Sequence, residues 1–414
     1  MSAVSEAAET KTHPGSAVEV LRIFTRLGLT SFGGPVAHLG YFRAEFVERR
    51  KWLDEAHYLD IVALCQFLPG PASSQTGITL GILRAGLPGA FAAWIGFSGP
   101  SVLAMILFAY GVATLGDIAH VPWLHGLKIV AVAVVAQAVW GMARNLCPDR
   151  ERATVAVGAA LLALAVPSWA GQIGAIVAGG LIGWSRFPAT TAMEATPITV
   201  RIARPLSVIS LVIFFVLLFG LPALVAATGN HLISLLSSFY RSGALVFGGG
   251  HVVLPLLQHS VVPPGWVGND AFLAGYGAAQ AVPGPLFTFA AYLGTVMGPP
   301  PHGWFGGVIC VSAIYLPSFL LLLGVLPFWD SLRRRGGIRA ALTGVNAAVV
   351  GLLLAALYTP VWTSAIFGPA DFAIGIIAFL LLVMWRVPPW LVVILGAIAA
   401  SIAATLTNGT GIQS

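Results

Sequence analysis

The chain has 414 residues, of which 57% are hydrophobic and only 9% are charged. A soluble globular domain carries about 25% charged residues, so 21 basic and 15 acidic side chains are too few to cover a water-exposed surface of this size. The composition excludes a soluble enzyme, a disordered chain and a secreted disulfide scaffold, and it predicts an all-α polytopic membrane protein. The net charge of +6 is explained by basic loops that orient the chain, and it also suits an anionic substrate.

In chain order, residues 1–16 form a polar tail without the pattern of a cleaved signal peptide, so we expect the N-terminus to stay in the cytoplasm. The segments long enough to cross a bilayer core of about 30 Å are 89–112, 205–227, 304–326 and 389–406. Weaker spans are predicted at 126–143, 340–358 and 371–385, and two short helices at 153–167 and 169–184 are expected to pair as a hairpin. Together these make nine predicted spans.

Four further apolar segments are interrupted by glycine and proline. The interruptions are Phe32-Gly-Gly-Pro35, Pro69-Gly-Pro71, Phe247-Gly-Gly-Gly250 and Pro283-Gly-Pro285. Proline removes a backbone donor and clashes with the preceding turn, so each interruption predicts a helix break. Inside a membrane, such breaks persist only where they are buried in protein or line a watery cavity. We therefore predict four re-entrant segments, with their breaks near the membrane midplane.

The four breaks are two copies of one pattern. At a shift of 215, the residues Phe24, Arg26, Gly28, Phe32, Gly33 and Gly34 match Phe239, Arg241, Gly243, Phe247, Gly248 and Gly249. At a shift of 214, the residues Trp52, Gln66, Pro69, Gly70 and Pro71 match Trp266, Gln280, Pro283, Gly284 and Pro285. The ordered series predicts a tandem duplication, with a first repeat at 17–186, a linker at 187–204, a connecting helix at 205–228, a second repeat at 229–408 and a tail at 409–414.

The basic residues predict that the two repeats are inverted. Residues 43–51 contain three arginines and a lysine, whereas the matching stretch 259–270 contains neither residue type. Conversely, four arginines lie within 333–339, and the matching stretch 114–125 has none. Because basic loops stay in the cytoplasm, the repeats must be inserted upside down relative to each other. Inverted repeats with broken helices are typical of secondary transporters.

The motifs around the breaks also resemble a known family. They are Ser31-Phe-Gly-Gly-Pro35, Phe42-Arg-Ala-Glu-Phe-Val-Glu-Arg-Arg-Lys-Trp52, Cys65-Gln-Phe-Leu-Pro-Gly-Pro71 with Gln75, Phe247-Gly-Gly-Gly-His251 and Gln280-Ala-Val-Pro-Gly-Pro-Leu286. Over residues 19–358 the chain resembles the chromate ion transporter (CHR) family in its long, two-domain bacterial form. The resemblance implies export of chromate across the bacterial plasma membrane, driven by the proton motive force, with sulfate as a competing look-alike. It implies neither an enzyme activity, a cofactor or a metal, nor a nucleic-acid partner, and a homodimer is one assembly we consider.

The breaks themselves predict an anion site. A dianion in a low dielectric needs donors and positive charge in place of its hydration shell, and the N-termini of half-helices supply both. The candidate residues at the breaks are Gly33, Gly34, Pro35, Gly70, Pro71, Gly248, Gly249, Gly250, Gly284 and Pro285. The polar candidates beside them are Gln66, Ser73, Ser74, Gln75, Gln280 and Thr288, which could bind an oxyanion or satisfy the broken backbone. The alternative for each break is a simple packing or kink position.

Arg26 and Arg241 are the predicted charged ligands. Each lies seven residues before a Gly-Gly break, and the duplication relates them, so one site could contact both. A guanidinium offers paired donors that suit an oxyanion. The alternative is that each arginine snorkels or pairs with a carboxylate.

The candidates for proton coupling are Asp60, Glu45, His38 and His251. For Glu45 we also consider pairing with neighbouring basic residues, and for each histidine a structural role.

Three other functions fit part of the sequence. A transporter of sulfate or of another tetrahedral oxyanion would need the same site, and a passive anion channel would need no coupling groups. A membrane enzyme acting on lipid-linked phosphate would need a nucleophile or a metal cluster, and the sequence offers no such spacing.

Overall fold

The computed structural model describes residues 15–115, 121–188, 202–247, 250–332 and 335–410. These residues are mostly helical and include no β-strand. The fold is therefore that of an all-α polytopic membrane protein, as predicted. The expected tails at 1–16 and 409–414 and the linker at 187–204 lie largely outside the described residues.

Two series of helices flank one connecting helix, α8 (Arg204–Thr228). The first half contains α1 (Ala17–Thr30), α2 (Gly34–Arg43), α3 (Glu55–Phe67), α4 (Ala72–Ala113), α5 (Pro122–Leu146), α6 (Arg150–Ala165) and α7 (Trp169–Arg186). The second half contains α9 (His231–Ala244), α10 (Val253–Val261), α11 (Asn269–Ala279), α12 (Phe289–Val296), α13 (Gly303–Val325), α14 (Trp329–Leu332), α15 (Gly336–Ala356), α16 (Pro369–Val383) and α17 (Pro389–Thr410). Each of the four predicted breaks separates two of these helices.

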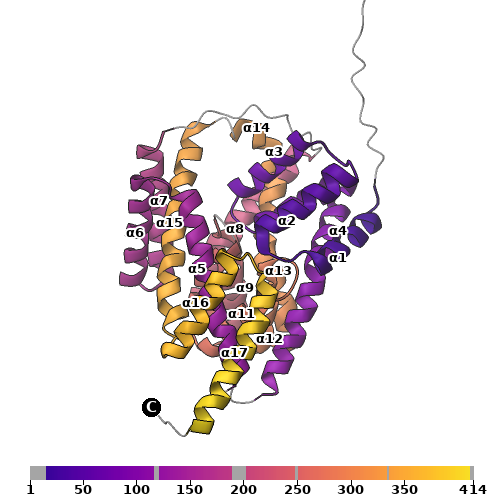
Figure 1. Cartoon of the computed structure of the whole chain (residues 1–414). Helices are drawn as coiled ribbons and strands as arrows, with labels where there is room; N and C mark the ends of the chain where they lie inside the picture. Colours follow the sequence, from indigo (N-terminus) through magenta and orange to yellow (C-terminus); the bar gives the residue numbers. More distant parts are fainter. Residues whose placement is uncertain (1–14, 116–120, 189–201, 248–249, 333–334, 411–414) are drawn as a thin grey trace, which may run out of the picture.

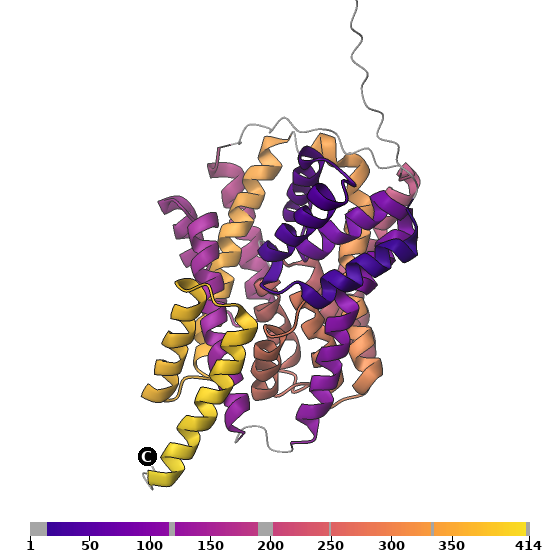
Figure 2. The same ribbon diagram turned by 45° about the vertical axis from the view of Figure 1, so that its right-hand side comes forward.

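The two halves are inverted in space. Helices α2 and α3 lie in the upper half of the bundle, whereas α11 and α12 lie in the lower half (Figures 1 and 2). Matching helices also make matching contacts. A Cβ at Gly28 of α1 would lie 2.6 Å from the carbonyl oxygen of Phe97 in α4, and a Cβ at Gly243 of α9 would lie 2.0 Å from that of Ile314 in α13. At both duplicated positions glycine therefore lets two backbones touch.

The nine predicted spans differ in whether they could cross a membrane. Among the described residues, five helices are long and apolar enough to cross a membrane: α4, α5, α8, α13 extended to Phe328, and α15 extended to Trp362. The other four predicted spans, now α6, α7, α16 and α17, are shorter or less apolar. At 1.5 Å per residue, the 15 residues of α16 reach only about 22 Å, which is less than the bilayer core of about 30 Å.

These four helices form two hairpins, and the α6–α7 hairpin is the one expected from the sequence. The α6–α7 hairpin descends from the upper end of the bundle, the α16–α17 hairpin rises from the lower end, and both turn near mid-height (Figures 1 and 2). Each hairpin packs on a helix of the opposite half. Helices α6 and α7 pack on α15 of the second half, and α16 and α17 pack on α5 of the first half. The tip of the α16–α17 hairpin, residues 384–388, therefore lies near mid-height of the bundle, with Arg386 exposed and Val387 half-buried.

The inverted arrangement predicts opposite accessibility for two matching connections. We expect a cysteine at Glu48 to react with an impermeant thiol reagent only from the cytoplasmic side, and a cysteine at Pro264 only from the outside. Both positions are exposed, and the native thiols of Cys65, Cys147 and Cys310 would first be removed. Labelling of both positions from one side would contradict the predicted orientation.

Candidate functional site

The four breaks converge where the two halves meet. The backbone N–H of Gly70 donates to the carbonyl of Val246 at 2.7 Å, and the backbone N–H of Gly284 donates to the carbonyl of Ser31 at 2.9 Å. Gly284 is the duplicate of Gly70, and Val246 is the duplicate of Ser31, so the two hydrogen bonds are exchanged symmetrically between the halves. Pro35 also approaches Gly250, because a Cβ on that glycine would lie 3.3 Å from the proline ring. The breaks of one half thus make hydrogen bonds and packing contacts with the breaks of the other half.

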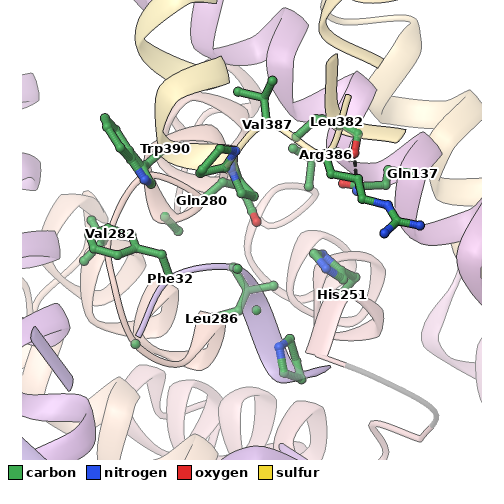
Figure 3. Close-up of a pocket in the computed structure, with 18 of the residues that line it drawn as sticks. Phe32, Gln137, His251, Gln280, Val282, Leu286, Leu382, Arg386, Val387 and Trp390 are labelled. Carbon is green, nitrogen blue, oxygen red and sulfur yellow. Dashed lines mark hydrogen bonds between the residues drawn. The ribbon is translucent and has the colours of Figure 1, made fainter. Parts of the chain in front are cut away.

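A pocket of about 440 Å³ opens beside this junction. Its wall combines Phe32 to Pro35 before and at the start of α2 with Arg386 to Trp390 at the tip of the α16–α17 hairpin. The end of α11 and the segment after it contribute Ala279, Gln280, Val282, Gly284 and Leu286. Val134 and Gln137 of α5 and His251 complete much of the remaining wall (Figure 3). Both repeats therefore contribute a duplicated break to one cavity.

The polar groups of this pocket favour a negative ligand. Among the described residues of the lining, Arg386 is the one permanently charged side chain, and none is an aspartate or glutamate. The side-chain nitrogen of Gln280 is buried and has no hydrogen-bond partner within the described part of the chain. Gln137 donates to the carbonyl of Leu382 at 3.3 Å, and the Nδ1 atom of His251 lies 2.8 Å from the Tyr276 hydroxyl.

Two helices begin at the pocket wall. The N-terminus of α2 is formed by Gly34 and Pro35, where the N-cap Gly33 has a φ of +101° and makes no side-chain capping bond. The N-terminus of α17 is formed by Pro389 and Trp390. Since a helix N-terminus carries a partial positive charge, both ends add to the anion preference of the pocket.

The structure brings together only part of the predicted site. Six of the predicted residues line the pocket: Gly33, Gly34, Pro35, His251, Gln280 and Gly284. Gly248 and Gly249 lie outside the described residues. Gly70, Pro71, Gly250 and Pro285 belong to the adjoining junction and are not part of the lining.

Most of the predicted polar ligands are engaged locally. The Gln75 side chain donates to the carbonyl of Pro69 at 2.8 Å, and the Thr288 hydroxyl donates to the carbonyl of Pro285 at 2.8 Å. These bonds satisfy the broken backbone, which is the alternative role considered for them. Ser74 lies 3.5 Å from the Tyr315 hydroxyl, and Ser73 lies 3.4 Å from Nδ1 of the buried His38. Gln66 is exposed, unlike its duplicate Gln280.

Arg26 lies in an ion-pair cluster away from the pocket. Its guanidinium is 2.5 Å from the carboxylate of Glu45, which is only 6% exposed. Arg49 and Arg50 bind the same carboxylate at 3.1 Å and 2.5 Å. Burial would raise the pKa of Glu45, but its hydrogen bonds to the three arginines outweigh that effect and lower the pKa. Pairing with a carboxylate is the alternative considered for Arg26.

Arg241 and Asp60 also lie outside the pocket. Arg241 lines a separate cavity of about 10 Å³ together with Gln172 and His259, so it shares no cavity with Arg26. Asp60 is buried, and its carboxylate accepts a hydrogen bond of 3.1 Å from the indole of Trp329.

Sequence reasoning missed Arg386, Gln137 and Trp390. The one signal for them was a charged residue, Arg386, two residues before a Pro-Pro pair at the end of an apolar run. Such a pattern indicates a turn, but it does not say that the turn reaches the breaks of the other segments.

A charged contact also connects helices at the end away from the hairpin tip. The ammonium of Lys128 in α5 is 2.8 Å from the carboxylate of Asp270 at the start of α11, and the two side chains are 4% and 41% exposed. Nearby, Nε2 of His125 lies 3.0 Å from the carboxylate of Asp371 in α16. The opposite ends of α5, α11 and α16 reach the pocket region, so these pairs fix the helices that carry much of its wall.

Inverted halves, broken helices and a pocket at their junction are typical of membrane transporters. Sequence comparison identifies the transporter family to which the chain belongs. The model of the chromate transporter family matches residues 18–184 and 233–401, one segment in each half. The chain belongs to the chromate transporter family.

Named relatives agree with this assignment. A chromate transport protein of Pseudomonas aeruginosa is 27% identical over 344 residues, which cover 82% of this chain and 80% of the relative. A probable chromate transport protein of Synechococcus elongatus is 25% identical over 401 residues, which cover 94% of this chain and 96% of the relative. A chromate transport protein of Cupriavidus metallidurans is 24% identical over 342 residues, which cover 82% and 81%. No solved structure matches the chain.

Proposed function

We propose that the protein exports chromate from the cytoplasm of a bacterial cell, driven by the proton motive force, with its N-terminus on the cytoplasmic side. The observation that carries the proposal is the pocket between the halves. Its lining includes a guanidinium and an unpartnered amide donor but no carboxylate. A tetrahedral dianion loses its hydration on entering such a pocket, and these donors would replace it.

The family and the names of the relatives support chromate as the substrate. Of the four candidates for proton coupling, His251 is the one that lines the pocket. We therefore place proton coupling at this residue, next to the bound anion, where a change in its charge would alter the binding of the anion.

Transport into inside-out membrane vesicles tests the proposal. We expect chromate to accumulate when the vesicles are energised, and an uncoupler to abolish the accumulation. Excess sulfate should reduce the rate if both dianions fit the pocket. Vesicles without the protein provide the control.

Two results would contradict parts of the proposal. Chromate flux that is unchanged by the uncoupler would indicate a passive channel. Uptake of sulfate in preference to chromate would move the assignment to another oxyanion transporter.

A further inference from the structure

We propose that Arg386, at the tip of the α16–α17 hairpin, is the residue that binds the negative charge of the transported anion. The inference rests on the proposed function, because it assigns a ligand to the pocket described above. Neither Arg386 nor its hairpin belongs to the duplicated glycine and proline motifs.

The first argument is position. The hairpin turns near mid-height of the bundle rather than at either end of it (Figures 1 and 2). Its tip supplies Arg386, Val387, Pro388, Pro389 and Trp390 to the pocket wall. Arg386 lies next to Gln137 and close to His251, across the pocket from Trp390 (Figure 3). A guanidinium is therefore carried to the junction where the two halves meet.

The second argument is charge. Arg386 forms no salt bridge with any carboxylate in the described part of the chain. Other arginines in this chain do form such pairs, as Arg26, Arg43 and Arg84 show. Arg386 is exposed in the pocket wall, so its guanidinium is available to an anion that enters the pocket.

The third argument is the backbone. Arg386 has a φ of +53°, in the left-handed region that favours glycine. A branched or long side chain held there costs free energy, and such strain is found mainly where function requires the residue. A glycine at this turn would be easier to fold, so the guanidinium itself accounts for an arginine at the position.

The fourth argument is asymmetry between the duplicated hairpins. The matching tip between α6 and α7 is Val166-Pro-Ser168 and carries no charge. Near it, the cavity that includes Gln172, Ile173 and Leu256 holds only about 10 Å³. At the shift of 215, Leu256 matches Tyr41, which lines the large pocket. The α6–α7 hairpin also lines a larger cavity of about 870 Å³ along its length. The asymmetry therefore lies in the tips, because only the tip of α16–α17 carries a guanidinium to the junction of the halves.

Equilibrium binding of radiolabelled chromate to the purified full-length protein tests the inference, with thermal stability measured in parallel. We expect Arg386→Gln to weaken binding about tenfold to a hundredfold, which is the usual range for a lost hydrogen bond to a charged group. Arg386→Lys should retain part of the affinity, because the charge remains while the paired donors are lost. Arg204→Gln, at an exposed arginine outside the pocket lining, should bind like wild type.

Arg386→Gly separates binding from folding. Glycine accepts the positive φ, so this variant should be at least as thermally stable as wild type while losing chromate binding. Wild-type affinity in both Arg386→Gln and Arg386→Gly would overturn the inference and leave the proposed function intact. Lower thermal stability together with lost binding in Arg386→Gly would show a structural role and would also overturn it. Failure of the wild-type protein to bind chromate would refute the proposed function itself.

Discussion

Replacing Gly284 or Gly70 with leucine should abolish transport while the protein still inserts into the membrane. Both glycines have positive φ angles, +104° and +127°, which leucine rarely adopts. Neither glycine has room beside it for a side chain. A Cβ at Gly284 would lie 2.2 Å from the Ser101 hydroxyl, and a Cβ at Gly70 would lie 2.8 Å from the Ser318 hydroxyl. Strain and overpacking at one such site each cost about 1–3 kcal/mol, and they act where the two halves touch.

A matched control and a rescue make this prediction specific. Gly220→Leu lies on the exposed face of α8, where a Cβ meets nothing closer than 3.9 Å, and it should transport normally. The smaller change Gly284→Ala should be partly rescued by Ser101→Gly, which removes the side chain that obstructs the new Cβ. Chromate uptake into vesicles, normalised to inserted protein, is the measurement. Normal transport by both leucine variants would mean that the breaks serve packing alone.

The second large effect is a loss of stability when the ion pair of Lys128 and Asp270 is broken. Replacing Asp270 should destabilise the protein more than replacing Lys128. Asp270→Asn leaves an almost fully buried ammonium without its counter-charge, whereas Lys128→Met leaves a carboxylate that is 41% exposed and can be hydrated. Breaking a buried pair costs about 3–5 kcal/mol. Because Asp270 is partly exposed, we expect about 2–3 kcal/mol for Asp270→Asn and less for Lys128→Met.

The double variant Lys128→Met/Asp270→Asn should recover most of the loss, because no buried charge remains. Thermal unfolding of the four proteins in detergent forms a double-mutant cycle that measures the coupling. Equal effects of the two single changes, with simple additivity in the double, would show that the pair contributes nothing specific.

The breaks and the inversion of the halves could be predicted because their signals are local. Proline combined with glycine at 33–35, 69–71 and 283–285 interrupts the helices locally, and the arginines of 43–51 and 333–339 orient their loops independently. The reciprocal bonds of Gly70 and Gly284 then follow from the duplication.

The pocket could not be predicted in the same way. Arg26 and Arg241 are equivalent in the sequence, but Glu45 pairs with Arg26, and Arg241 lines another cavity. Arg386 has no duplicated partner, and its role depends on a hairpin that packs on α5 of the other half. Contacts between segments more than a hundred residues apart leave no periodic signal in one sequence.

The exchanged hydrogen bonds between the breaks also bear on how such a protein arose. A single repeat would leave the N–H of its Pro-Gly-Pro turn without an acceptor and its hairpin without the helix on which it packs. An unduplicated ancestor would therefore have been complete only when bound to a second copy of itself inserted in the opposite direction, as an antiparallel dimer of dual topology. Helix α8, only 11% buried over its apolar window, would then have entered as a tether that fixed the two orientations in one gene and freed the halves to diverge.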